Sequence, residues 1–76
     1  MTTSDLADLL IAQLLKREGG TKRRWRQVVG AVRWHDPATH PHCNWSLEPG
    51  GSARESEAVE TLLDELRLRH PIVTQG

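Results

Sequence analysis

Leucine recurs in two segments of the chain, one near each end, at the three- and four-residue intervals of an amphipathic helix. In segment 5–17 the apolar residues spread over about half of the helical circumference; they are Leu6, Ala7, Leu10, Ile11, Leu14 and Leu15. Segment 52–70 begins with Ser52 and Glu55, which can cap each other's backbone donors. Pro71 ends it because proline has no amide proton to donate. Both segments are predicted to be helices that bury one face.

Between these helices, apolar and polar residues alternate with the period of a half-buried strand. Inward positions are predicted for Val32, Trp34, Cys43, Trp45 and Leu47. The intervening segment 36–42 holds two prolines, which indicates a hairpin connection longer than a two-residue turn. Segment 25–29 fits either a short helical turn or the entry to a strand. The predicted fold is α+β, in the order α, short turn, β, β, α, with two amphipathic helices packed on one face of a small antiparallel hairpin.

A chain of 76 residues is predicted to form one domain, 1–76, because it is too short to support a second core. Its ends, 1–4 and 74–76, are expected to be loose. The longest apolar run is far shorter than the roughly 20 residues that span a bilayer. The start of the chain lacks the basic region of a secretory signal, and the single cysteine, Cys43, has no internal disulfide partner. We therefore expect a cytoplasmic protein without membrane contact.

Four potential zinc ligands, His35, His40, His42 and Cys43, lie within nine positions. Their spacing does not match structural zinc sites, in which a longer segment separates two ligand pairs. Cys43 is predicted to face the core and His42 the solvent, so both cannot readily bind one ion. A catalytic thiol would also need an orienting group and a cleft. We expect no metal, no cofactor and no enzymatic activity, and the sequence leaves the role of this cluster open.

Charge is unevenly distributed although the formal net charge is zero. Residues 1–34 carry seven bases and three acids, and residues 35–76 carry three bases and seven acids. Such an asymmetry can steer a charged partner or hold the two halves together. The basic run from Lys22 to Arg26 suits phosphate contact, so a small DNA-binding accessory or excision factor is the alternative function. A pI of about 6.9 and the lack of a known nucleic-acid-binding motif make nucleic acid the less favoured partner.

Some apolar side chains exceed what the predicted core needs. Trp34 and Trp45 are expected to form a cross-strand core pair. Trp25, flanked by arginines, has no such place and fits an interface, where Trp and Arg are enriched. Leu9 lies outside the apolar face of its helix, and exposed leucine marks interaction surfaces. The candidate partner-binding residues are Leu6, Leu9, Arg23, Arg24, Trp25, Arg26 and Leu68.

Three strings of the chain resemble a family of short α-proteobacterial proteins found on mobile genetic elements. They are Trp25-Arg26-Gln27-Val28-Val29-Gly30, the run from Ala38 to Ser46, and segment 58–73. The most specific part is His40-Pro41-His42-Cys43-Asn44-Trp45. The family is that of the QseM antiactivators. Its members bind LuxR-type quorum-sensing regulators of the TraR kind and a second transcriptional activator, FseA, and so repress conjugative transfer of an integrative element.

The resemblance implies a protein-binding antiactivator that needs a complementary surface but no cleft, cofactor or nucleophile. In this hypothesis, the activator is bound by exposed leucine on the first helix, the nearby basic residues and Trp25. This contact blocks the DNA binding or dimerisation of the activator. The resemblance supplies no map of the binding surface, and the sequence does not define the oligomeric state.

Overall fold

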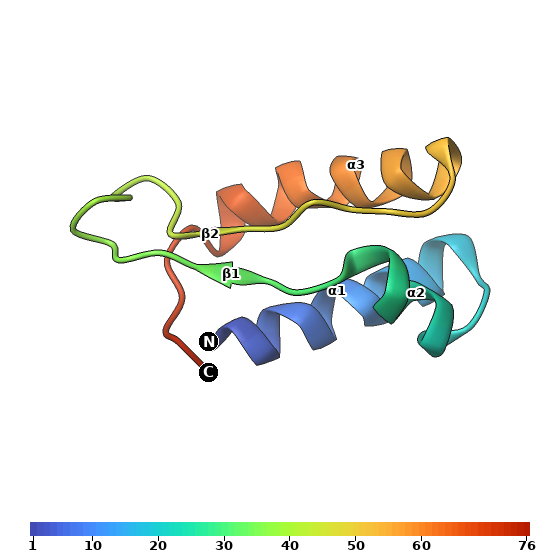
Figure 1. The fold of residues 1–76 in the computed structure, drawn as a ribbon, viewed down its shortest axis with the longest axis horizontal. Helices are drawn as coiled ribbons and strands as arrows, with labels where there is room; N and C mark the ends of the chain where they lie inside the picture. The colour runs from blue at the N-terminus through green and yellow to red at the C-terminus, as the bar shows by residue number, and fades with distance from the viewer.

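The computed structural model describes the whole chain, residues 1–76. Three helices and one antiparallel hairpin follow one another in the order α1 (Thr3–Glu18), α2 (Lys22–Val29), β1 (Arg33–Trp34), β2 (Trp45–Ser46) and α3 (Ala53–Arg69) (Figure 1). The predicted α+β class and the order of the two long helices and two strands are confirmed. Segment 25–29, which fitted either a short helical turn or the entry to a strand, belongs to helix α2.

Both long helices begin with a reciprocal cap. At α1, the Asp5 amide donates to Thr2 Oγ1 and the Thr2 amide donates to Asp5 Oδ2, each at 3.0 Å. Helix α1 therefore begins two residues before the predicted start, with Thr2 as its cap. The predicted cap of α3 is present, since Ser52 and Glu55 exchange the same pair of bonds. Gly19 ends α1 with φ 75°, a conformation that favours glycine.

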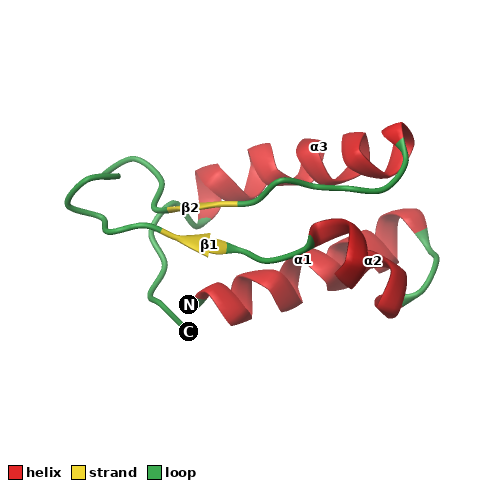
Figure 2. Ribbon diagram, viewed as in Figure 1, coloured by secondary structure: helices red, strands yellow, loops and turns green.

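Strands β1 and β2 form the antiparallel hairpin (Figure 2). Its register pairs Trp34 with Trp45 and Arg33 with Ser46. The predicted cross-strand pairing of the tryptophans is thus present, with Trp45 buried in the core and Trp34 half-buried against it. Each indole N–H donates to a backbone carbonyl just after α3: Trp34 to Val73 at 3.0 Å and Trp45 to His70 at 2.8 Å. Because a two-stranded hairpin is marginal alone, these bonds and the packing beneath them hold it in place.

The helices pack mainly on one another, and side chains from β2 and the C-terminal segment complete the core. Its buried members are Leu6, Leu10, Ile11, Leu14, Trp25, Val28, Val29, Trp45, Leu47, Val59, Leu62, Leu63, Leu66 and Val73. The extended chain between β2 and α3 runs beside α3 (Figure 1), where the Ser56 hydroxyl donates to the Gly50 carbonyl at 3.2 Å. None of the helices combines the length and apolar content that a membrane crossing requires.

The two ends of the chain lie side by side and are hydrogen-bonded, in place of the loose ends expected at 1–4 and 74–76 (Figure 1). The Thr3 amide donates to the Thr74 carbonyl and the Thr74 amide donates to the Met1 carbonyl, each at 3.0 Å. The Thr3 hydroxyl donates to the Gly76 carbonyl at 2.6 Å. Thr3 is buried, so its polar groups need partners, and the C-terminal segment supplies them.

Candidate protein-interaction surface

Two of the seven residues predicted to contact a partner are in the core. Leu6 is fully buried, and only 6% of Trp25 is exposed. The Trp25 indole N–H donates to the Gly19 carbonyl at 2.7 Å, so α2 packs against the end of α1 through this side chain. The expectation that Trp25 lies at the surface was therefore wrong, and Leu6 lies on the buried face of its helix and not where a partner can reach it. Their burial follows from the packing of α1 against both other helices, which the sequence pattern of a single helix does not reveal.

Leu9 is half-buried and lines a narrow groove of about 130 Å³ between α1 and α3. Arg17 of α1 and Glu65 of α3 bridge the same groove through two hydrogen bonds, at 2.9 and 3.3 Å. The hydrogen bonds of this pair lower the pKa of Glu65 and raise the pKa of Arg17. Leu9 therefore borders a contact between two helices of the same chain, which leaves little of its side chain for a partner.

Leu68 projects into solvent from the last turn of α3 and is 87% exposed. It follows the buried Leu66 by two positions, which places it about 200° around the helix, on the side away from the core. Ile72, just after the helix, is 47% exposed. Exposed apolar side chains mark a contact surface when several lie together, so Leu68 and Ile72 are the candidates for such a surface at this end of α3.

Helix α2 exposes four cations, Lys22 and the three predicted contact residues Arg23, Arg24 and Arg26, and two of the four face acids of the same chain. Arg24 forms two hydrogen bonds with Glu55, at 2.8 and 2.9 Å. These bonds, and a further one from the Ser52 amide, lower the pKa of Glu55 to about 2. Arg26 lies 4.0 Å from Asp8, whereas Lys22 and Arg23 form no ion pair. Arg24 therefore ties α2 to the start of α3.

A second groove, larger in volume, lies between α1 and α2. We call it the α1–α2 groove; its volume is about 340 Å³ and its lining is Asp8, Ile11, Ala12, Leu15, Lys22 and Arg26. Ile11 forms a buried floor, with the half-buried Leu15 and the exposed Ala12 beside it. Sequence reasoning missed this groove because it assigned Ile11 and Leu15 to the core. Their positions at the edge of the apolar face were the available signal.

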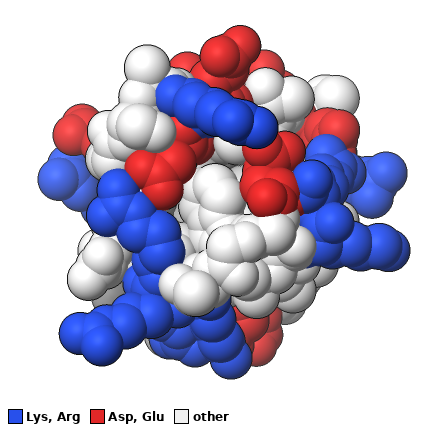
Figure 3. Space-filling model, turned by 90° about the vertical axis from the view of Figure 1, so that its right-hand side faces the viewer, with Lys and Arg blue, Asp and Glu red and all other residues white.

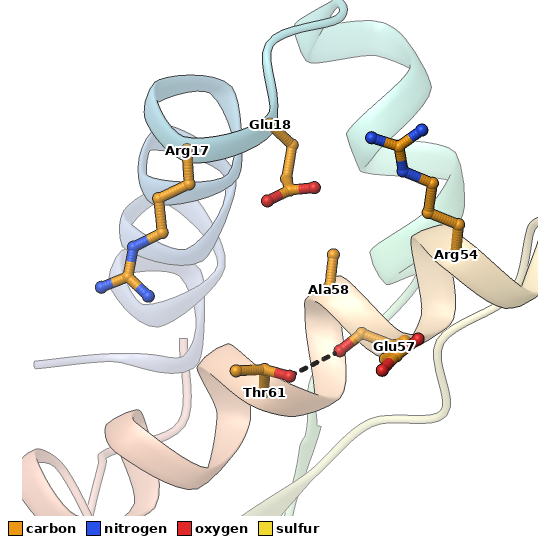
Figure 4. Close-up of a pocket in the computed structure, with 6 residues that line it drawn as sticks. All are labelled: Arg17, Glu18, Arg54, Glu57, Ala58 and Thr61. Atoms are coloured by element: carbon orange, nitrogen blue, oxygen red, sulfur yellow. Dashed lines mark hydrogen bonds between the residues drawn. The ribbon is translucent and has the colours of Figure 1, made fainter.

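The end of the molecule where α1 stops and α3 starts carries charges of both signs around a centre of uncharged residues (Figure 3). A crevice of about 260 Å³ opens there, lined by Arg17, Glu18, Arg54, Glu57, Ala58 and Thr61. Figure 4 shows Glu18 and Arg54 reaching over it from opposite helices, while the Thr61 hydroxyl donates to the Glu57 carbonyl at 3.0 Å. Its charged side chains are exposed and alternate in sign, so it concentrates no charge for a ligand.

The histidine cluster orders the loop between the strands. The rings of His35 and His40 stack with centroids 4.4 Å apart, and His35 Nε2 lies 2.9 Å from Ser46 Oγ. Stacked rings direct their nitrogen lone pairs along parallel planes and not toward one point. No three His, Cys, Asp or Glu side chains converge on a position for a metal ion. Cys43 is half-buried with its thiol 3.4 Å from the Trp45 carbonyl, and His42 is exposed, as their strand positions predict.

Comparison with known proteins gives no match. No family model, no curated protein and no solved structure is significantly similar to this chain.

Proposed function

We propose that this protein is an antiactivator that sequesters a LuxR/TraR-type quorum-sensing transcriptional activator, with an FseA-like activator as a second partner, and so represses conjugative transfer of a mobile element. The resemblance of His40-Pro41-His42-Cys43-Asn44-Trp45 and of segment 58–73 supports this assignment. The structural observation that carries it is Leu68, a large apolar side chain held outside the core on α3.

The proposed mechanism is occlusion of the activator by direct binding. Leu68, with Ile72 just after the same helix, supplies an apolar anchor, and the exposed Asp64, Arg67 and Arg69 of α3 supply a polar rim. Central anchors of such interfaces typically contribute about 2 kcal/mol or more when truncated to alanine. Binding at this surface blocks either the DNA-binding or the dimerisation surface of the activator, and no catalytic step is required.

The experiment measures binding of a purified TraR-type activator to its operator DNA while this protein is titrated in. We expect the wild type to abolish operator binding near equimolar ratio. Leu68→Ala should require roughly 30-fold more protein, the ratio that corresponds to about 2 kcal/mol. Thr61→Ala, an exposed position on the same helix, is the matched control and should inhibit like the wild type. Full inhibition by Leu68→Ala places the contact elsewhere, and no inhibition by the wild type refutes the proposal.

A small DNA-binding accessory is the second candidate, favoured by the placement of α2. This helix follows α1 after a three-residue turn containing Gly19 and Gly20, and it exposes Lys22 and Arg23 without acidic partners. If this candidate holds, the protein shifts duplex DNA at low salt, and Arg23→Gln weakens binding and reduces the salt dependence by about one counterion. The antiactivator proposal predicts no shift of duplex DNA by the protein alone.

A further inference from the structure

We propose that the α1–α2 groove binds an amphipathic helix of the partner protein that presents a leucine-type side chain flanked on one side by carboxylates. The inference rests on the proposed function, because it takes the partner to be a protein. It adds a second contact site, on the opposite side of α1 from the groove that holds Leu9.

The floor of the groove accounts for the apolar part of this partner. Ile11 closes the bottom, Leu15 leaves part of its side chain in solvent, and Ala12 is exposed at the wall. The groove that holds Leu9 also has three apolar side chains, but its volume is only about 130 Å³. The other two surface hollows have one apolar side chain each. In the α1–α2 groove, the charged residues on the α2 wall are all positive. Apolar surface in a concave position is suited to the inserted side chain of an amphipathic helix.

The wall formed by α2 accounts for the carboxylates. Lys22 and Arg26 stand one helical turn apart, and Lys22 has no acidic partner. The contact of Arg26 with Asp8 is long, at 4.0 Å, and both side chains are more than half exposed. Such a pair contributes little, so a partner carboxylate can replace Asp8. Two acids spaced by one turn on the partner helix match these two cations.

The wall formed by α1 restricts where the acids of the partner can be. Asp8 is the only charged residue on that side of the groove and is negative. A helix with acids on both flanks would place one of them against Asp8. The groove therefore prefers a helix whose carboxylates lie only on the flank that meets α2, and Asp8 sets that orientation.

A second copy of this chain is the competing occupant, because α3 carries Leu68 near the acids Glu60 and Asp64. Two observations disfavour it. Asp64 lies 3.5 Å from Arg67 of its own helix, so one of those acids is already engaged. The groove and Leu68 also belong to different surfaces, so contacts between copies would be head-to-tail and would not close into a dimer.

The test uses two synthetic helical peptides of equal length. One carries leucines four positions apart with glutamates along one flank, and the other has lysines in place of the glutamates. Each is titrated into the isotopically labelled full-length protein, with NMR shifts to locate the site and calorimetry for the Kd. We expect the glutamate peptide to shift the signals of Ile11, Ala12 and Leu15, and the lysine peptide to leave them unchanged.

Charge variants separate the groove from general electrostatics. Lys22→Glu with Arg26→Glu should raise the Kd of the glutamate peptide at least tenfold. Arg33→Glu with Arg54→Glu makes the same change in net charge at exposed positions that neither line the groove nor form an ion pair, and should stay within about threefold, the residual long-range effect of charge. Asp8→Asn should tighten binding of a peptide with glutamates on both flanks. Equal loss in the two double variants, or shifts spread over all basic residues, overturns the inference.

Two further outcomes are decisive. If the protein alone forms species whose mass grows with concentration, and Lys22→Glu with Arg26→Glu abolishes them, a second copy fills the groove and the inference fails. In the operator-binding assay, equal inhibition by the wild type and by that double variant overturns the groove as the partner site while the antiactivator function stands. Absence of inhibition by the wild type refutes the function, whereas the peptide titration still decides the chemistry of the groove.

Discussion

Asn44 holds the backbone of Val73 through both atoms of its amide group. Its Nδ2 donates to the Val73 carbonyl at 2.7 Å, and the Val73 amide donates to its Oδ1 at 2.8 Å. Both residues are buried, and the Trp34 indole N–H donates to the same carbonyl at 3.0 Å. The hairpin and the segment after α3 are thereby joined through polar groups that have no access to water, which makes this contact a main determinant of how the C-terminal segment folds back.

Replacing Asn44 is expected to destabilise the protein strongly. In Asn44→Ala the Val73 amide remains buried without an acceptor, and an unsatisfied buried donor costs about 1–3 kcal/mol. With the packing that is also lost, the free energy of unfolding should fall by about 3 kcal/mol, measured by urea denaturation. His42→Ala, two positions earlier but exposed, should change it by less than about 0.5 kcal/mol. Equal effects of the two variants would show that the clamp contributes little.

The pairing of Arg24 with Glu55 predicts a specific acid sensitivity. In the folded protein the hydrogen bonds from Arg24 and from the Ser52 amide lower the pKa of Glu55 from 4.5 to about 2. A depressed pKa means that the ionised carboxylate stabilises the fold. This contribution is complete above the unfolded pKa and is lost as the pH falls from about 5 toward 2. We therefore expect the urea midpoint to fall over this range in the wild type.

Two variants isolate this effect. Glu55→Gln removes the titrating group, so its urea midpoint should be lower at pH 7 and should fall less steeply between pH 5 and 2. Glu57→Gln, two residues later and without an ion pair, should keep the acid slope of the wild type. If Glu55→Gln retained the full acid slope, other carboxylates would be responsible for it.

The elements with a strong local signal were predictable from the sequence. The Ser52 and Glu55 cap fixes the start of α3, and the leucine spacing fixes which face of α3 is buried, because both depend on neighbours within one helix. The pairing of Trp34 with Trp45 followed from period-two alternation on either side of a proline-containing loop. These features are local, so no knowledge of the tertiary contacts was needed.

The features that sequence reasoning missed depend on contacts between distant segments. Helix α2 has only eight residues, too few to separate a helical from an extended pattern. The burial of Trp25 requires the carbonyl at the end of α1, and the pairing of Thr3 with Thr74 joins opposite ends of the chain. The candidate site was predictable only in part. The exposure of Leu68 follows from its position on α3, whereas the α1–α2 groove forms only when the two helices pack together.

Trp25 should behave as a core residue in mutagenesis. Trp25→Phe keeps most of the apolar volume but leaves the Gly19 carbonyl without its indole donor, so a loss of about 1–2 kcal/mol in unfolding free energy is expected. Trp25→Ala should cost about 3–5 kcal/mol because it opens a cavity. Calorimetric melting checks both values, with the neighbouring Arg23→Ala as the exposed control. If Trp25→Ala melted like the wild type, Trp25 would be a surface residue after all.

Leu68 should show the opposite behaviour, and this contrast makes its functional test interpretable. Leu68→Ala removes apolar atoms that are already in water, so the free energy of unfolding should change by less than about 0.5 kcal/mol. Leu63→Ala, on the buried face of the same helix, should cost about 2–5 kcal/mol. Paired urea titrations measure both changes at one pH.

With stability unchanged, any loss of activator inhibition in Leu68→Ala arises from the contact itself and not from partial unfolding. An exposed leucine also favours aggregation, so the alanine variant should aggregate no more than the wild type. A large loss of stability in Leu68→Ala would mean that the side chain packs within the fold, and the structural observation behind the proposed antiactivator function would then be lost.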